Sequence, residues 1–260
     1  MVDVIIPSNI GVALDIDGTL VDSNRECYQR VCEVWESEYG TDYPLTYEQF
    51  HSFRPLVERV SDFFSLSYIF MENDGTMPED SAEILEAYKN DEHATRMGKE
   101  FYKMRDVRKK EDMEGWLADN RVYEGVPEMM QQLGETGWDV FAVTSKDEDS
   151  VRKLLDFHGF DGTVKSVYDK ETGKGRKEQF TRASEERGVP FDRMVSYDDI
   201  PNQLLAAMDL GMTPVAATQG YGDREEIVKH NFTPSLPRDF VERVRFARMR
   251  ESFRRKYGDI

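Results

Sequence analysis

The sequence contains few cysteines and no long apolar run. Cys27 and Cys32 are its only cysteines in 260 residues, and they lie within one predicted helix, where they are poorly placed to pair with each other. No cluster of cysteines and histidines has the spacing of a zinc site. No stretch approaches the ~18 consecutive apolar residues that cross a bilayer, and Met1 to Asn9 has no basic segment before an apolar run. We therefore expect a cytoplasmic protein in a reducing compartment.

Positive charge is also scarce. The chain has 34 Lys and Arg against 51 Asp and Glu, which gives a net charge of −17. Such a charge disfavours nonspecific binding to nucleic acid or to anionic membranes, so we expect neither as a partner. It also repels small phosphorylated molecules, and a site for one would need a metal ion and local basic residues to reverse the field. The acidic balance fits either a salt-adapted organism or an ordinary acidic cytosolic protein.

The chain is long enough for one full domain and a smaller one. Residues 1–22 and 123–236 contain short apolar strands that alternate with helices, a pattern typical of an α/β fold with a doubly wound, Rossmann-like parallel sheet. Residues 23–122 have helical periodicity and no convincing strand, so we predict an inserted all-helical domain. Residues 237–260 are predicted to form a basic helix, for which packing on the acidic body is the favoured interpretation.

Two carboxylates follow the first predicted strand directly. Val12 to Leu14 is a short apolar run that indicates a buried strand, and Asp15 and Asp17 stand at its end. Positions i and i+2 of a strand point to the same side, so these two carboxylates can converge. Like charges this close repel each other unless a cation or a proton lies between them, and Mg²⁺ prefers such oxygen ligands. A pair of solvated acids at a strand end is the alternative interpretation.

Other polar residues stand at the ends of later predicted strands. Thr144 follows the strand 140–143, and Asp198 and Asp199 follow the strand 193–197. In parallel α/β sheets, ligands bind at the carboxyl ends of the strands. The sequence therefore predicts that these residues share one site with the first pair of carboxylates.

The stretch Asp15-Ile-Asp17-Gly-Thr-Leu resembles the first motif of the haloacid dehalogenase-like superfamily, and Thr144-Ser-Lys resembles its second. The resemblance implies that Asp15 is a nucleophile that forms an aspartyl-phosphate, and that Asp17 is the general acid and base. Dehalogenases and phosphonate hydrolases of the superfamily lack the second Asp, so the presence of Asp17 favours phosphoryl transfer. The residues that the two motifs imply for binding the substrate are Gly18, Thr19, Thr144, Ser145 and Lys146.

The third motif of the superfamily is a lysine near the start of a helix, and two candidates remain open. Counting back from Phe180 by the spacing that is usual for this motif selects Lys174. Members with a shorter segment before the helix would select Lys177 instead. The resemblance implies that this lysine pairs with the nucleophile and with the substrate phosphate.

The fourth motif supplies metal ligands in the superfamily, and here it departs from the usual pattern. Counting back from the end of the next helix selects Asp199 as the ligand, and counting forward from the strand selects Asp198. In either register, Asn202 or Gln203 replaces a second acid, which predicts weaker metal binding. The ligands implied for a Mg²⁺ site are Asp15, the backbone carbonyl of Asp17, Asp198 or Asp199, and Asn202.

The chain resembles phosphoglycolate phosphatase-like members of the superfamily, and residues 23–122 stand in the sequence position of the family's helical cap. We expect a Mg²⁺-dependent phosphatase that hydrolyses a small phosphorylated metabolite through an aspartyl-phosphate. Arg54 and Arg59, with Lys146, are candidates for cations that face the substrate. Two alternatives remain: a sugar phosphomutase on the same fold, or a catalytically degenerate protein with a binding or regulatory role.

Overall fold

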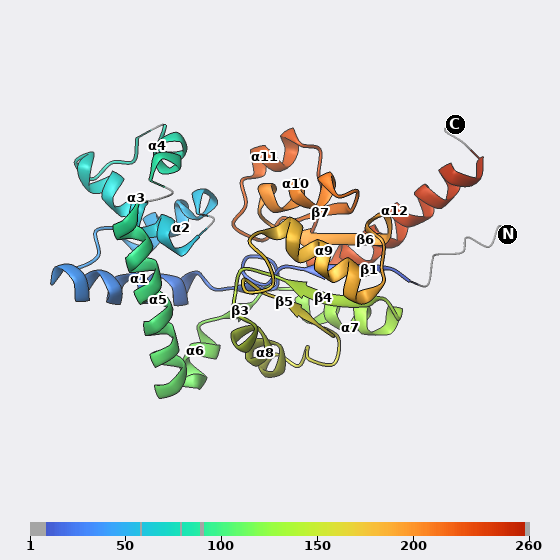
Figure 1. The fold of residues 1–260 in the computed structure, drawn as a ribbon, viewed down its shortest axis with the longest axis horizontal. Helices are drawn as coiled ribbons and strands as arrows, with labels where there is room; N and C mark the ends of the chain where they lie inside the picture. The colour runs from blue at the N-terminus through green and yellow to red at the C-terminus, as the bar shows by residue number, and fades with distance from the viewer. Residues whose placement is uncertain (1–8, 58, 79, 89–90, 258–260) are drawn as a thin grey trace. The chain divides into compact units, whose positions relative to one another are not determined.

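The structure is a computed structural model that describes residues 9–57, 59–78, 80–88 and 91–257. It divides into two compact units. Unit 1 consists of Met1–Asp22 together with Val122–Ile260, and unit 2 consists of Ser23–Arg121. Each unit has its own arrangement of helices and strands, which Figure 1 labels.

Unit 1 is built on a parallel sheet with the strand order β5-β4-β1-β6-β7-β8 (Figure 1). Every neighbouring pair in this sheet is parallel. Because β1 lies inside the sheet, with later strands added on both sides, the predicted doubly wound α/β fold is confirmed. The strands are β1 (Gly11–Leu14), β4 (Asp139–Val143), β5 (Val167–Tyr168), β6 (Met194–Asp198), β7 (Thr213–Ala217) and β8 (Thr233–Ser235).

Helices pack on both faces of this sheet. On one face, Ala13 of β1 packs in a buried cluster with Phe180 and Ala207, which belong to α9 and α10. On the other face, Tyr197 of β6 contacts Phe240 of α12 with ring centroids 4.3 Å apart, and α12 packs against α7. The helices of unit 1 are α7 (Val126–Thr136), α8 (Glu148–Phe157), α9 (Arg176–Arg187), α10 (Pro201–Asp209), α11 (Arg224–Lys229) and α12 (Pro237–Tyr257), with a short 3₁₀ helix η2 (Phe191–Arg193).

Unit 2 is helical, as the periodicity of residues 23–122 predicts. Its core is rich in aromatic residues, such as Phe50 and Phe63, whose rings stack with centroids 4.3 Å apart. A buried ion pair also joins α1 to α5, with Arg105 Nη2 2.5 Å from Glu26 Oε2. The helices are α1 (Asn24–Tyr39), α2 (Tyr47–Ser52), η1 (Arg54–Leu56), α3 (Val60–Glu72), α4 (Ser81–Ala87), α5 (Glu92–Glu111) and α6 (Met113–Ala118).

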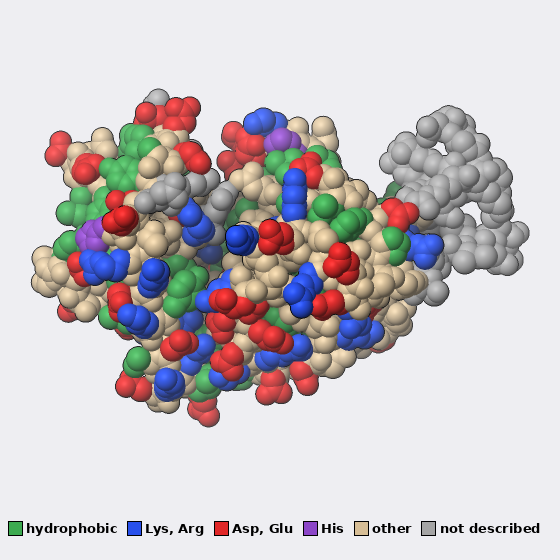
Figure 2. Space-filling model, viewed as in Figure 1, with side chains coloured by type: hydrophobic (Ala, Val, Ile, Leu, Met, Phe, Trp, Pro, Cys, Tyr) green, Lys and Arg blue, Asp and Glu red, His purple; other side chains and the backbone are tan. Residues whose placement is uncertain are grey.

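A second, two-stranded sheet pairs β2 (Val21–Asp22) with β3 (Arg121–Val122). On the face seen in Figure 2, acidic and basic side chains are interspersed with one another. Within the described part of the chain, no helix combines the length and the apolar character needed to cross a membrane.

Candidate active site

The ends of neighbouring strands of unit 1 meet at the carboxyl edge of the sheet. The register pairs Leu14 of β1 with Tyr197 of β6 and with Ala142 of β4. The Asp15 N–H donates to the Tyr197 carbonyl at 3.0 Å. Asp15, which follows β1, therefore lies level with Asp198, the last residue of β6. Parallel pairing thus brings together carboxylates that are far apart in the sequence.

Three buried carboxylates are clustered at this edge. One oxygen each of Asp15, Asp198 and Asp199 lies within 4.8 Å of the other two. Burial and the charge of Asp198 raise the pKa of Asp15 to about 7. Burial also raises the pKa of Asp198 to about 6, although the guanidinium of Arg176 opposes this shift. Buried acids at this spacing need protons or a cation between them, and their hard oxygen donors suit a divalent cation. The three residues therefore fit a divalent metal site.

Arg176 supplies the positive charge that faces this cluster. Its Nη2 lies 3.1 Å from Asp15 Oδ1 and 3.1 Å from Asp198 Oδ2, and its side chain is only 7% exposed. Its Nε donates to Gln203 Oε1 at 3.2 Å, and its Nη1 donates to the Val143 carbonyl. A planar guanidinium can reach all four partners at once, whereas an ammonium on a flexible stem cannot hold the same set.

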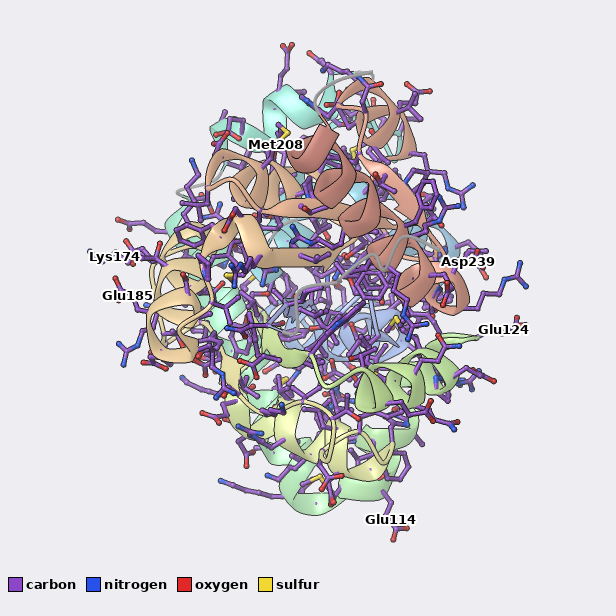
Figure 3. All side chains as sticks on the ribbon, turned by 90° about the vertical axis from the view of Figure 1, so that its right-hand side faces the viewer. Glu114, Glu124, Lys174, Glu185, Met208 and Asp239 are labelled. Carbon is purple, nitrogen blue, oxygen red and sulfur yellow. The ribbon has the colours of Figure 1, made fainter. Side chains whose placement is uncertain are left out.

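Neither candidate lysine of the third motif is placed beside Asp15. The ammonium of Lys177 lies 2.7 Å from Asp209 Oδ2, and both side chains are more than half exposed. Lys174 is exposed and points outward in Figure 3. The physical reason is the phase of α9: its first residue, Arg176, points at the carboxylates, and the next residue is turned by about 100° around the helix axis.

The second aspartate of the first motif faces a buried lysine. Lys146 Nζ lies 3.1 Å from Asp17 Oδ1, with the lysine side chain fully buried and the aspartate 22% exposed. The Lys146 N–H donates to Thr144 Oγ1 at 3.3 Å, and the Thr144 carbonyl accepts from Gln179 Nε2 at 2.9 Å. The first two motifs therefore meet through this ion pair, as their positions at neighbouring strand ends lead one to expect.

Asp199 lies in a tight pocket of backbone and small residues. Its Oδ2 accepts from the Tyr221 N–H at 2.6 Å, and its Oδ1 accepts from Thr19 Oγ1 at 3.4 Å. Gly18 has a φ of +83°, and a Cβ at this position would lie 2.7 Å from Asp199 Cγ. Only glycine fits both this backbone conformation and this close approach. The carboxylate is therefore held in one orientation.

Two of the remaining predicted residues of unit 1 are exposed. Ser145 is exposed directly after Thr144, and Asn202 is exposed in the first turn of α10. Gln203, the other candidate for the lost acid, contacts Arg176. Asp198 and Asp199 both belong to the cluster, so the two registers of the fourth motif do not exclude each other.

The two arginines predicted to face the substrate belong to unit 2. Arg54 Nε donates to Asn24 Oδ1 at 3.1 Å, and its guanidinium lies 5.2 Å from the centroid of the Phe63 ring. Arg59 Nη2 lies 3.5 Å from Asp62 Oδ1. Both arginines therefore have acceptors or a ring within their own unit.

Sequence reasoning missed Arg176 and the hydrogen-bonding role of Tyr221. The signal for Arg176 was its position after Gly175, where the helix starts, but the third motif of the superfamily implies a lysine at this point. The signal for Tyr221 was its place between Gly220 and Gly222 after the strand 213–217, because paired glycines indicate a close backbone approach.

Comparisons with known proteins agree with this geometry. Residues 11–211 match the family of haloacid dehalogenase-like hydrolases. A 5'-nucleotidase from Pseudomonas aeruginosa is 26% identical over 120 residues, which are 45% of this chain and 54% of that protein. The chain thus spans about half the length of this curated relative.

Solved structures share the fold. A predicted phosphoglycolate phosphatase from Haemophilus somnus superposes with a TM-score of 0.67 at 16% identity, over 92% of this chain and 99% of that one. A protein described as a beta-phosphoglucomutase from Thermotoga maritima superposes with a TM-score of 0.58 at 16% identity, over 91% and 98% of the two chains. The family match covers well over half of the chain, and the carboxylate cluster lies at the sheet edge where its first and fourth motifs end. The chain belongs to the haloacid dehalogenase-like hydrolases.

Proposed function

We propose that the protein is a Mg²⁺-dependent phosphatase that hydrolyses a small phosphorylated metabolite through an aspartyl-phosphate on Asp15. The observation that carries the proposal is the cluster of Asp15, Asp198 and Asp199 at one sheet edge, with Asp17 and Lys146 beside it. Phosphoryl transfer needs a nucleophile, a proton donor and positive charge around the transferred group. The site contains a residue for each of these tasks.

In the first step, a carboxylate oxygen of Asp15 attacks the phosphorus, and the bond from phosphorus to the leaving oxygen breaks. Asp17 donates a proton to that oxygen, so the product leaves as an alcohol. In the second step, Asp17 takes a proton from water, the water oxygen attacks the phosphorus, and the bond to Asp15 breaks. Inorganic phosphate leaves, and both carboxyl groups return to their starting states.

The basic residues of the site have separate tasks in this mechanism. Lys146 Nζ lies 3.1 Å from Asp17 Oδ1, so it stabilises the Asp17 carboxylate that forms when the proton is donated, and it offers positive charge to the phosphoryl oxygens. Arg176 holds the carboxylate of Asp15 in place through Nη2, the task that the resemblance gives to a lysine of the third motif. The Thr144 hydroxyl is a candidate donor to the phosphoryl group, because its residue follows β4 at the same edge.

A divalent cation completes the charge balance of the site. Asp15, Asp198 and Asp199, with the backbone carbonyl of Asp17, would hold Mg²⁺, which offsets the repulsion between the nucleophile and an anionic phosphate when it is bound. When all three carboxylates are ionised, as ligands of a cation would be, one guanidinium leaves them a formal charge of −2. This match supports a divalent rather than a monovalent ion.

The relatives suggest which substrates to test. One is named a 5'-nucleotidase and another a phosphoglycolate phosphatase, so the panel should contain nucleoside monophosphates, phosphoglycolate and sugar phosphates. Unit 2 is inserted in the sequence between the first and second motifs, where members of the family carry their cap. We propose that it acts as a cap that selects the substrate, with Arg54 and Arg59 as candidate contacts. A cytoplasmic location belongs to the same proposal and is supported by the cysteine usage.

The test is the release of inorganic phosphate across this panel, with MgCl₂ and after chelation. The proposal predicts release that depends on Mg²⁺ and that Asp15→Asn abolishes. The alternative is a phosphomutase, as the Thermotoga maritima protein of similar fold is described. A phosphomutase would instead form an isomeric sugar phosphate with little free phosphate. A folded protein that binds phosphometabolites but releases phosphate from none of them would favour the degenerate, regulatory alternative.

A further inference from the structure

The chain passes between its two units through a paired ribbon. Unit 1 ends at Asp22 and resumes at Val122, and these residues belong to β2 and β3, which pair with each other. The Tyr123 N–H also donates to the Leu20 carbonyl at 3.2 Å. The two crossings are therefore one hydrogen-bonded element.

One residue of unit 1 contacts both this ribbon and the carboxylate cluster. The Tyr221 hydroxyl donates to Asp22 Oδ1 at 2.8 Å, while its backbone N–H donates to Asp199 Oδ2 at 2.6 Å. The tyrosine is 5% exposed. A hydrogen bond from a buried phenol to a carboxylate is charge-assisted, which makes it one of the stronger kinds in proteins.

The loop that carries Tyr221 has little room to move independently of Asp199. A Cβ on Gly220 would lie 2.6 Å from Asp199 Oδ2, and one on Gly222 would lie 2.7 Å from the Asp199 carbonyl carbon. Gln219 Nε2 also donates to the Thr19 carbonyl at 2.8 Å. A displacement of Asp199 therefore has to move the loop, and with it the phenol that holds Asp22.

We propose that Tyr221 is a positioning residue that couples cation binding at the carboxylate cluster to the order of the ribbon at Asp22. A cation that fixes Asp199 also fixes the Tyr221 backbone, and the phenol then restrains the crossing to unit 2. Because coupling between two sites is reciprocal, a restrained ribbon also favours the orientation of Asp199 that binds the cation. This inference rests on the cation site of the proposed function.

The experiment measures amide hydrogen exchange by mass spectrometry, with and without MgCl₂, in the full chain. In the wild type, Mg²⁺ slows exchange in peptides that cover residues 18–26 as well as in those that cover 196–203. In Tyr221→Phe, Mg²⁺ still protects 196–203, because the backbone N–H remains, but its effect on 18–26 falls by about tenfold, which is the scale expected from one charge-assisted bond. Calorimetric titration with MgCl₂ establishes separately that each variant binds the ion.

Matched variants separate coupling from a merely structural role. Asp22→Asn keeps an oxygen that accepts from the phenol, although without the charge, and retains part of the Mg²⁺ effect on 18–26, whereas Asp22→Ala loses it. The double variant Tyr221→Phe/Asp22→Ala reduces the effect of Mg²⁺ on residues 18–26 no further than either single change does. Tyr168→Phe, at a buried tyrosine of β5, behaves as wild type.

Three results would overturn the coupling. One is exchange in 18–26 that rises equally with and without Mg²⁺ in Tyr221→Phe, which a structural role predicts. Another is a wild type whose 18–26 peptides do not respond to Mg²⁺ while phosphate release does, which leaves the proposed function intact. The third is a wild type that does not bind Mg²⁺, which removes both proposals. Coupling without release of phosphate from any substrate would refute only the phosphatase.

Discussion

Replacing Arg176 by alanine is the most informative single change in this protein. Its guanidinium lies between Asp15 and Asp198, at 3.1 Å from each, and is almost completely buried. Removing one partner of a buried ion pair leaves an uncompensated buried charge, which typically destabilises a protein by about 3–5 kcal/mol. For a chain of this size, each kcal/mol lowers the melting temperature by roughly 2–4 °C. We therefore expect Arg176→Ala to melt about 6–20 °C below the wild type at neutral pH without metal.

The loss should depend on pH, because the two carboxylates titrate within reach of the measurement. The folded pKa values of Asp15 and Asp198, about 7 and about 6, lie above the ordinary value of 3.8. The folded state therefore binds more protons than the unfolded state between about pH 4 and pH 7, and the stability of the metal-free protein falls as the pH rises through this window. Arg176 opposes both upward shifts, so its removal makes the fall steeper. The decrease in melting temperature caused by Arg176→Ala should therefore be large near pH 8 and small near pH 5.

Thermal unfolding of the metal-free proteins at these two pH values, followed by circular dichroism, tests the prediction. Arg182→Ala is the matched control, because Arg182 belongs to the same helix and pairs with Glu186 on the surface. Arg176→Lys should fall between the wild type and Arg176→Ala, since it keeps the charge but not the four partners. Saturating MgCl₂ should recover part of the loss by binding the folded state. A loss in Arg176→Ala that matches the control, or that does not change with pH, would show that the guanidinium does not balance these carboxylates.

Three other predictions concern the same edge of the sheet. Asp15→Asn should abolish phosphate release while leaving the circular dichroism spectrum unchanged, because the amide is nearly isosteric but cannot attack phosphorus; turnover in a folded variant would contradict the covalent mechanism. Gly18→Ala should destabilise the protein by about 1–3 kcal/mol through its left-handed backbone and weaken Mg²⁺ binding by displacing Asp199; unchanged binding by calorimetry would show that the carboxylate is not a ligand. Gln203→Asp should tighten Mg²⁺ binding by adding a negative charge beside the buried guanidinium, whereas Asn202→Asp, at an exposed position, should not; the opposite order would assign Asn202 to the metal site.

Much of the fold could be predicted from local patterns. Apolar runs such as residues 12–14 and 140–143 are short enough to be strands and alternate with helical segments, and that alternation specifies a doubly wound parallel sheet. The absence of strand patterns in residues 23–122 likewise predicts an inserted helical region. These features depend on the period of the apolar residues, which the sequence contains in full.

The placement of Asp15 at the end of the first strand also needed no tertiary information. Which residues of the neighbouring strands lie beside Asp15 did require tertiary information. Counting from flanking motifs left Asp198 and Asp199 as alternatives, whereas the register of β6 against β1 puts an oxygen of each beside Asp15. Strand register is a property of two chain segments together, and a count along one segment does not determine it.

Tertiary structure alone decided which basic side chain faces the carboxylate cluster. Lys174, Arg176 and Lys177 lie within four positions of one another, and all are basic. Which of them reaches the carboxylates depends on where α9 begins and on its phase against the sheet, because successive residues of a helix point about 100° apart. The helix begins at Arg176, so the guanidinium is buried against Asp15 and Asp198 while Lys177 turns toward Asp209. The sequence by itself determined that a positive charge was available at this edge, and only the packing of α9 on the sheet determined which residue carries it.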